Sequence, residues 1–177
     1  MRNSYDESDV RRIVEQLATR IASAFDVADA FNIVGIRTRG EVIAERLTQH
    51  LRSHKYTNIG RGVLDITLYR DDLSEIGPRP LVRPTQLDIS IDGRPLLLVD
   101  DVLFTGRSVR SALDLLADFG RPSVIRLVVL VDRGGRELPI QPDFVGLTLC
   151  DVPRDHRVNV RLRETDGRDE ISVEPKA

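Results

Sequence analysis

Cysteine is almost absent from this chain, and its scarcity excludes two kinds of architecture. Cys150 is the only cysteine among 177 residues. Neither an internal disulfide framework nor a multi-cysteine zinc site can therefore form. His156 follows closely enough for a catalytic thiol to be considered. A lone cysteine at the expected end of a strand is more often a small buried hydrophobic residue, and we favour that interpretation.

Long apolar runs are also missing. Residues 1–7 lack the apolar stretch of a signal peptide. The most apolar segment, Val124 to Val131, is interrupted by Arg126 and is too short to span a bilayer. We therefore expect a soluble cytoplasmic protein with no membrane partner. No repeat or low-complexity tract is visible, and 177 residues with a hydrophobic fraction of 41% suit a single domain over residues 1–177.

Lysine is scarce too, and arginine takes its place. Only Lys55 and Lys176 are lysines among the 26 cationic residues. The planar guanidinium matches phosphate and carboxylate oxygens, so the excess suits an anion-handling protein. A biased genome would give the same excess, and we weigh that explanation at least equally. The net charge of -2 neither requires nor excludes nucleic acid, because a local basic patch can act on an acidic protein.

Segments with helical and strand-like patterns alternate along the chain. Apolar residues at helical spacing predict helices at about 8–25, around Ile43 to Leu51, and at 107–119. Strands are expected at 31–36, 63–69, 96–99 and 124–131, followed by two or three weaker strands. This alternation predicts an α/β fold with a mostly parallel central sheet flanked by helices.

The regular pattern stops between Arg70 and Gly93. Aspartate, glycine and proline are frequent there, which predicts a long polar loop with room for a short hairpin. Loops of this length in compact domains are usually functional lids or disordered segments. We therefore expect a flexible lid over about residues 70–93.

The segment from Leu96 to Ser108 combines two chemical features. Its apolar start predicts a buried strand that ends at Asp100 and Asp101, and Thr105 to Ser108 opens the next helix. Ligands of doubly wound sheets bind beyond the carboxyl ends of the strands, and a helix N-terminus is a natural phosphate site. Each half alone is as readily a solvated turn or a capped helix start. Together they predict acceptors for a ribose diol beside donors for its phosphate, and they match neither a Walker A loop nor a dinucleotide fingerprint.

This segment resembles the phosphoribosyl pyrophosphate (PRPP) motif of type I phosphoribosyltransferases. Three further stretches narrow the resemblance, namely Val34 to Gly40, Leu64 to Leu73 and Val129 to Ile140. From roughly Ser8 to Ile171 the chain resembles the PyrR family, pyrimidine operon regulators that are also uracil phosphoribosyltransferases. The resemblance implies the type I phosphoribosyltransferase fold.

The resemblance also implies roles for individual residues. Asp100 and Asp101 would bind the ribose hydroxyls and Arg39 would face the departing pyrophosphate, which makes these three the candidate catalytic residues. Leu103 to Ser108 would wrap the 5-phosphate, and the lid would run from Arg70 to about Leu87. The expected substrate-binding residues are Thr38, Arg39, Gly40, Arg70, Asp100, Asp101, Val102, Leu103, Phe104, Thr105, Gly106, Arg107, Ser108, Asp132 and Arg133. Among them, Asp132 and Arg133 fall where the family places the base.

The implied reaction converts uracil and PRPP into UMP and pyrophosphate, assisted by Mg²⁺ that enters with PRPP. Cations would neutralise the charge that builds on the departing pyrophosphate, and lid closure would exclude competing water. The sequence identifies neither protein ligands for the metal nor a general base for uracil. Hypoxanthine or orotate would suit the same PRPP site, so uracil rests on the resemblance alone.

The resemblance implies RNA binding as well. Family members bind the leader transcript of the pyr operon, with UMP or UTP promoting binding, through a basic surface on a dimer face. A homodimer or a larger homo-oligomer is therefore expected. The candidate RNA-binding residues are Arg20, Arg136, Arg154 and Arg157.

The sequence departs from the family pattern on this surface. Ser23 and Gly135 stand where histidines are usual, and Leu147 to Pro153 replaces a Lys-Asn-x-Pro-Thr stretch. RNA affinity depends chiefly on phosphate neutralisation, so the loss of cations weakens binding. Three hypotheses remain: a bifunctional enzyme and RNA regulator, a metabolic phosphoribosyltransferase that has lost RNA binding, and a nucleotide-sensing RNA binder without catalysis. The intact candidate catalytic residues argue against the third.

Overall fold

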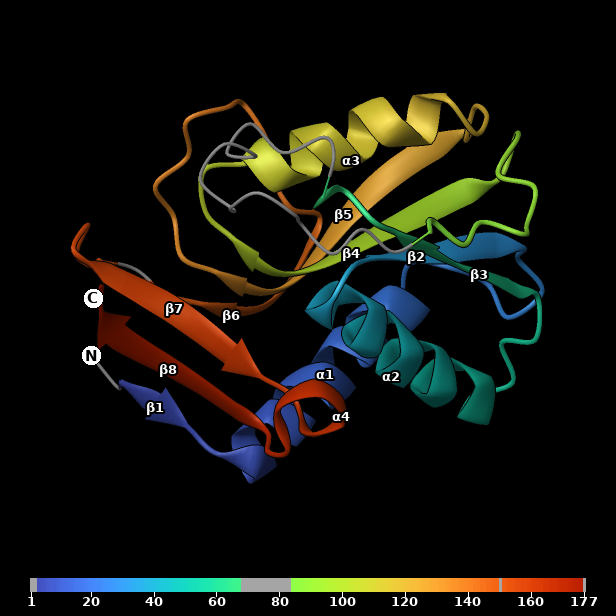
Figure 1. The fold of residues 1–177 in the computed structure, drawn as a ribbon. Helices are drawn as coiled ribbons and strands as arrows, with labels where there is room; N and C mark the ends of the chain where they lie inside the picture. The colour runs from blue at the N-terminus through green and yellow to red at the C-terminus, as the bar shows by residue number, and fades with distance from the viewer. Residues whose placement is uncertain (1–2, 68–83, 150, 177) are drawn as a thin grey trace.

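A five-stranded parallel sheet forms the centre of the protein in a computed structural model, which describes residues 3–67, 84–149 and 151–176 (Figure 1). The strand order is β3-β2-β4-β5-β6, and every pairing is parallel. The strands are β2 (Phe31–Ile36), β3 (Ile59–Leu64), β4 (Pro95–Leu103), β5 (Val124–Asp132) and β6 (Phe144–Thr148). The predicted α/β fold is confirmed.

Three helices cover the two faces of this sheet. The helices α1 (Glu7–Ala22) and α2 (Arg39–Ser53) lie on one face, and α3 (Arg107–Ala117) lies on the other (Figure 1). The apolar stripe of each helix is buried against the sheet, which gives one hydrophobic cluster on each face. All three helices were predicted from these stripes, although α1 and α3 end a few residues earlier than expected.

A second sheet was not predicted from the sequence. It is antiparallel, with the order β1-β8-β7, and consists of β1 (Ser4–Tyr5), β7 (His156–Arg161) and β8 (Glu170–Pro175). The short helix α4 (Arg163–Asp166) connects β7 to β8. Figure 1 places this small sheet on the side of the molecule where the parallel strands β4 and β5 end.

Two predicted strand boundaries are wrong. The strand expected at 63–69 is β3, which starts at Ile59 and ends at Leu64. Its start was missed because Gly60 and Gly62 interrupt the apolar pattern there. A Cβ at Gly60 would lie 2.2 Å from the Oδ1 of Asn32 in β2, so the strand needs glycine there. The strand expected at 96–99 continues to Leu103, which places Asp100 and Asp101 within the last residues of β4.

The described part of the expected lid, residues 84–93, packs against the core. Gln86 and Val63 exchange two backbone hydrogen bonds of 2.7 and 2.9 Å, and Ile91 is buried. This part of the segment is therefore anchored to β3, and the lid over about residues 70–93 stays a prediction. Residues 68–83, which include Arg70, and Cys150 lie outside the described residues. No helix in the described ranges has the length and apolar character needed to cross a membrane.

Candidate active site

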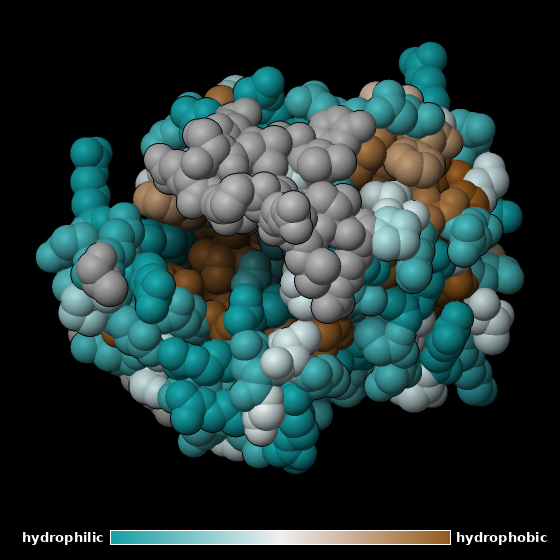
Figure 2. Space-filling model, in the orientation of Figure 1, coloured by the Kyte–Doolittle hydropathy of each residue, from teal (hydrophilic) through white to brown (hydrophobic). Residues whose placement is uncertain are grey.

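Three segments that the sequence singled out come together at one edge of the parallel sheet. Residues 37–40 follow β2, residues 100–108 end β4 and lead into α3, and residues 132–137 follow β5. These three strands are neighbours and run in parallel, so their carboxyl ends meet. Figure 2 shows a hollow in this region, with apolar residues on its floor and polar residues around it.

The two carboxylates of β4 are held by their own backbone. The backbone N–H of Asp101 donates to Asp100 Oδ1 at 2.9 Å, and that of Val102 donates to Asp101 Oδ1 at 2.9 Å. Asp100 is buried and Asp101 is half-buried. Both carboxylates are thus fixed at the end of the strand, where carboxylate oxygens can accept hydrogen bonds from a vicinal diol.

A small hollow follows directly, at the start of α3. Gly106 precedes the helix with φ +93°, a left-handed conformation that favours glycine. Ser108 and Val109, in the first turn of α3, line this hollow, whose volume is about 30 Å³, and the backbone N–H of Arg107 donates to Thr105 Oγ1 at 3.3 Å. Its lining contains Asp100, Val102, Leu103, Phe104, Thr105, Gly106, Ser108 and Val109. The expected phosphate-binding residues are therefore brought together, except Arg107.

Arg107 is directed to another loop. Its Nε donates to Glu137 Oε2 at 2.8 Å, and both side chains are about half exposed. The same loop closes on the start of α3, because the backbone N–H groups of Glu137 and Leu138 both donate to Thr105 O, at 3.0 and 3.1 Å. Arg107 thus ties the segment after β5 to the phosphate loop.

The segment after β2 is pressed against the end of β4. Gly40 is buried in the first turn of α2, and a Cβ there would lie 2.4 Å from the backbone oxygen of Val99. Only hydrogen fits in that space, so Gly40 allows the close approach. Thr38, the residue before the helix, is exposed, and Arg39, the first residue of the helix, is half-buried. The expected pyrophosphate loop therefore adjoins the two carboxylates.

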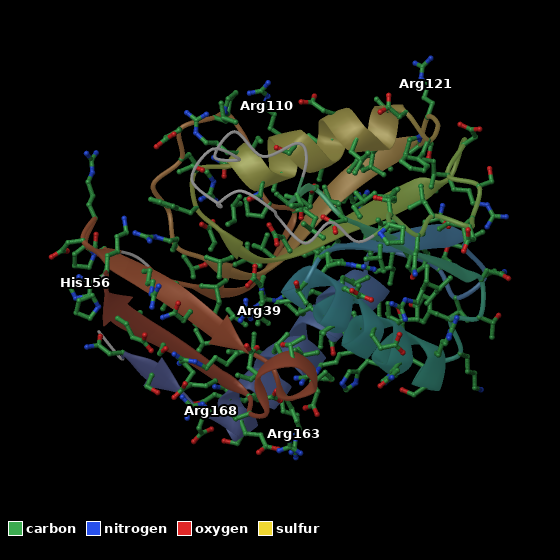
Figure 3. The ribbon with its side chains drawn as sticks, in the orientation of Figure 1. Arg39, Arg110, Arg121, His156, Arg163 and Arg168 are labelled. Carbon is green, nitrogen blue, oxygen red and sulfur yellow. The ribbon has the colours of Figure 1, made fainter. Side chains whose placement is uncertain are left out.

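Arg39 has an ion-pair partner that sequence reasoning missed. Its Nε donates to Asp166 Oδ2 at 3.1 Å and its Nη2 donates to Asp166 Oδ1 at 2.7 Å. The hydrogen bonds to Asp166 raise the pKa of Arg39, and the charge of Asp101 raises it further. Hydrogen bonding to Arg39 holds the pKa of Asp166 well below its usual range. Figure 3 places Arg39 between the parallel sheet and the small sheet.

A cavity of about 630 Å³ opens beyond the end of β5. Its lining contains Phe104, Asp132, Arg133, Gly134, Gly135, Arg136, Glu137, Thr148, Leu149, Asp151, Val152, Arg154 and Lys176. Small-molecule sites commonly have volumes of roughly 300–1,000 Å³, so a heterocyclic base fits this cavity. Asp132 and Arg133, which the resemblance assigns to the base, both line this cavity.

Arg133 is a buried cation in the wall of this cavity. Only 7% of the residue is exposed, and its guanidinium carbon lies 3.9 Å from the centroid of the Phe104 ring. Its Nη1 donates to His156 O at 3.1 Å, whereas its Nε has no partner among the described residues. Burial lowers the pKa of Arg133. Asp132 pairs instead with Arg136, whose Nη2 lies 2.7 Å from Asp132 Oδ2.

The four candidate RNA-binding arginines lie on different elements. Arg136 is largely engaged within its loop, since it also donates to Ile140 O at 3.0 Å and Phe104 O at 3.1 Å. Arg154 is exposed at the base cavity, and Arg157 is exposed on β7. Arg20 is exposed on α1 and donates to Val145 O of β6 at 2.7 Å. The structure brings only Arg136 and Arg154 to one cavity.

Sequence reasoning missed Asp166 because no local pattern connects it to the site. It lies 127 positions from Arg39 and approaches it only through the small sheet and α4. Glu137, the partner of Arg107, was missed for the same reason. Within residues 3–67, 84–149 and 151–176, no group of three or more histidine, cysteine or acidic side chains is arranged to hold a metal ion.

Known proteins similar to this chain agree in fold. Residues 5–161 match the family model of the phosphoribosyl transferase domain. The hypoxanthine phosphoribosyltransferase of Trypanosoma cruzi superposes with a TM-score of 0.71 at 19% identity and covers 99% of this chain and 98% of its own. A hypoxanthine-guanine phosphoribosyltransferase of Bacillus anthracis superposes with a TM-score of 0.69 at 16% identity, with 98% of both chains covered. At such identities the likeness establishes the fold alone.

Three curated relatives are much closer in sequence, and each is named bifunctional protein PyrR. The relative from Chloroflexus aurantiacus is 52% identical over 162 residues, which are 92% of this chain and 86% of the relative. That from Deinococcus radiodurans is 47% identical over 165 residues, or 93% and 90% of the two chains. That from Thermus thermophilus is 46% identical over 165 residues, or 93% and 91%.

Proposed function

Because this chain belongs to the PyrR family of phosphoribosyltransferases, we propose that it transfers the phosphoribosyl group of PRPP to uracil. The resemblance drawn from the sequence motifs is thereby confirmed at the level of the family. One observation carries the proposal. An arginine, a pair of carboxylates beside a helix N-terminus, and a base-sized cavity converge at the ends of three adjacent strands.

The arrangement suits a substitution at the anomeric carbon of ribose. The bond between this carbon and the pyrophosphate oxygen breaks, the bond to uracil N1 forms, and the N1 proton is lost. Asp100 and Asp101 bind the two ribose hydroxyls and stabilise the electron-poor sugar. Arg39 stabilises the negative charge that develops on the leaving pyrophosphate. The start of α3 holds the 5-phosphate and so fixes the ribose between the two groups.

Mg²⁺ is the cofactor that we propose to enter with PRPP. The residues present fit a shared ion better than a protein-held one, because the described residues provide no three-ligand cluster of their own. Asp100 and Asp101 carry the hard oxygen atoms that Mg²⁺ prefers, and pyrophosphate supplies the remainder. When bound, the ion neutralises charge on the pyrophosphate and orients it.

Uracil is placed in the cavity beside Phe104. Arg133 presents a cation in its wall, and the backbone of the loop after β5 adds polar groups at its rim. A buried guanidinium without a carboxylate partner can donate hydrogen bonds to a carbonyl oxygen of the base. The choice of uracil over another base follows from the family.

The enzymatic proposal is tested with purified protein, PRPP, Mg²⁺ and uracil. UMP and pyrophosphate should form, and Asp101→Asn should lower kcat/KM about a hundredfold by removing a charge beside the reacting carbon. Asp114→Asn, in an exposed helix-surface pair with Arg110, is the matched control and should leave the rate unchanged. Hypoxanthine and orotate are assayed in parallel. Absence of UMP under every condition, or equal turnover of another base, would contradict the proposal.

We further propose that the protein regulates pyrimidine operon transcription by binding the pyr leader RNA, promoted by UMP or UTP, as a homodimer or larger assembly in the cytoplasm. Family membership and the exposed guanidinium groups of Arg154, Arg157 and Arg20 support this second activity. The organism's own leader RNA is titrated at several salt concentrations, with and without UMP. Loss of one phosphate contact in Arg157→Gln should reduce the salt slope by about one. If UMP-dependent binding is absent at modest salt, the regulatory proposal is wrong and the protein is a metabolic phosphoribosyltransferase only.

A further inference from the structure

We propose that Asp166 is a positioning residue for phosphoribosyl transfer, whose carboxylate holds one edge of the Arg39 guanidinium so that the other edge faces the leaving pyrophosphate. This inference rests on the proposed function and deepens it. It assigns a role to the turn between β7 and β8, which belongs to none of the motifs that the sequence singled out.

The Arg39–Asp166 ion pair leaves three of the five guanidinium N–H groups of Arg39 free to bind an anion. A guanidinium carries five N–H groups. Asp166 accepts from the Nε and Nη2 atoms at 3.1 and 2.7 Å, which occupies the side edge. Arg39 makes no other hydrogen bond to the described residues. Three N–H groups remain, and one from each Nη atom forms the end edge, which matches two phosphate oxygens. Pyrophosphate and Asp166 therefore do not compete for the same donors.

Asp166 is itself held in place before any substrate binds. The backbone N–H of Leu162 donates to its Oδ2 at 2.9 Å, and the Thr165 hydroxyl donates to the same atom at 2.7 Å. These bonds close the α4 turn around the carboxylate. The side chain of Asp166 is 20% exposed and that of Arg39 is 37% exposed, so the pair is accessible from solvent rather than buried in the core.

The whole turn is fastened to α2 at a second point. Arg46 donates through Nε to Glu164 Oε1 at 2.9 Å and through Nη1 to Asp169 Oδ2 at 2.8 Å. Burial alone would lower the pKa of Arg46, but the hydrogen bonds to Glu164 and Asp169 outweigh burial and raise it. Arg39 and Arg46 lie about two helical turns apart on the same side of α2. Glu164 and Asp169 thus hold the turn against α2 through Arg46, whereas the Asp166 carboxylate is held separately, by the Leu162 N–H and the Thr165 hydroxyl.

The pair contributes to orientation more than to folding. A partly exposed ion pair usually stabilises a protein little, whereas an unrestrained arginine must lose rotamer freedom each time it binds an anion. Asp166 removes that freedom in advance. Its loss should therefore weaken the interaction with the pyrophosphate group and leave the base site unaffected.

Kinetics of Asp166→Ala, Asp166→Asn and Glu164→Gln test this inference. Glu164 belongs to the same turn but binds Arg46, so Glu164→Gln is the matched control for a purely structural effect. Asp166→Ala should raise the KM for PRPP and lower kcat, each about tenfold, with the KM for uracil unchanged. Asp166→Asn keeps one acceptor and should lie between Asp166→Ala and the natural protein. Should Asp166→Ala fail to fold, Asp166→Asn carries the comparison.

A double-mutant cycle with Arg39→Gln provides the second readout. If Asp166 acts through Arg39, adding Asp166→Ala to Arg39→Gln should change kcat/KM by less than about twofold. The inference is overturned if the loss is the same in both backgrounds, if Glu164→Gln behaves like Asp166→Ala, or if both Asp166 variants match the natural protein while it makes UMP. If the natural protein makes no UMP, the proposed function fails instead. In that case the inference is tested by calorimetric titration of both proteins with pyrophosphate. Equal pyrophosphate affinities of Asp166→Ala and the natural protein would contradict a positioning role for Asp166.

Discussion

Arg39 and Arg133 lie after β2 and β5, on either side of the carboxylates of β4, yet their surroundings differ. Arg39 is partly exposed and bound at two atoms by a carboxylate. Arg133 is 7% exposed, lies against the Phe104 ring and donates to the backbone oxygen of His156. The pKa of Arg39 is raised by hydrogen bonding to Asp166, and the pKa of Arg133 is lowered by burial.

The difference corresponds to two kinds of ligand. A guanidinium that is already oriented and fully charged at the edge of a site suits a highly charged pyrophosphate, which arrives from solvent. A buried guanidinium without a carboxylate partner suits a neutral base, which can accept its hydrogen bonds without bringing a charge into the cavity. The proposed site therefore has a charged, exposed arginine at the end assigned to the leaving pyrophosphate. It has a buried arginine at the end assigned to the neutral base.

The largest expected effect comes from a change that moves Arg39 without altering it. In Gly40→Ala the new Cβ would lie 2.4 Å from Val99 O, so the start of α2 must shift. Such overpacking costs about 1–3 kcal/mol, and a displacement of about 1 Å at a site can lower activity by about a hundredfold. Steady-state kinetics and thermal unfolding measure the two effects.

Gly134→Ala is the matched control at the Arg133 end. Gly134 has φ +70°, and a methyl group at this position would meet no atom of the described residues within 4 Å beyond its chain neighbours. Only backbone strain of about 1 kcal/mol is therefore expected. Its activity should remain within a fewfold of the natural protein. Equal kinetic losses in Gly40→Ala and Gly134→Ala would contradict this comparison. The account requires the segment at Gly40 to be fixed against β4 and the loop at Gly134 to accept a methyl group.

A smaller effect is expected at the buried arginine. Arg133→Met replaces a cation that has no carboxylate partner among the described residues by an apolar side chain of similar length. Replacing buried ions in this way is often neutral or stabilising, so the unfolding temperature should stay the same or rise. The KM for uracil should rise about tenfold, the effect of losing one charge-assisted hydrogen bond. A large loss of stability with an unchanged KM would show that Arg133 is only structural.

The smallest effect concerns acid stability. The pKa of Asp166 is lowered in the folded state from its ordinary value of 3.8 by the hydrogen bond from Arg39. A carboxyl group with a lowered pKa stabilises the fold fully above that ordinary value, and the stabilisation is lost as pH falls below it. The difference in unfolding temperature between the natural protein and Asp166→Asn should be small, constant from about pH 6 to 8, and shrink below about pH 4. A difference that grows on acidification would contradict the pairing.

Much of this molecule was predictable because its information is local. The strand and helix patterns gave the parallel sheet and its three helices, and the end of β4 gave the two carboxylates with the start of α3. The pairing of β1 with β8 was not predictable, since Ser4 meets Ser172 only through the tertiary fold. The same holds for Asp166, whose contact with Arg39 depends on that small sheet. The glycines of β3 obscured its start because they serve contacts with Asn32 and Leu87.

Comparison of the two Michaelis constants in Arg39→Gln and Arg133→Met brings both ends of the site into one experiment. The KM for PRPP should rise at least tenfold in Arg39→Gln with the KM for uracil unchanged, and the reverse should hold in Arg133→Met. Such a crossed result assigns the pyrophosphate to the end of β2 and the base to the end of β5. If both variants raise the same constant, or if the pattern is inverted, the proposed placement of the two substrates is wrong.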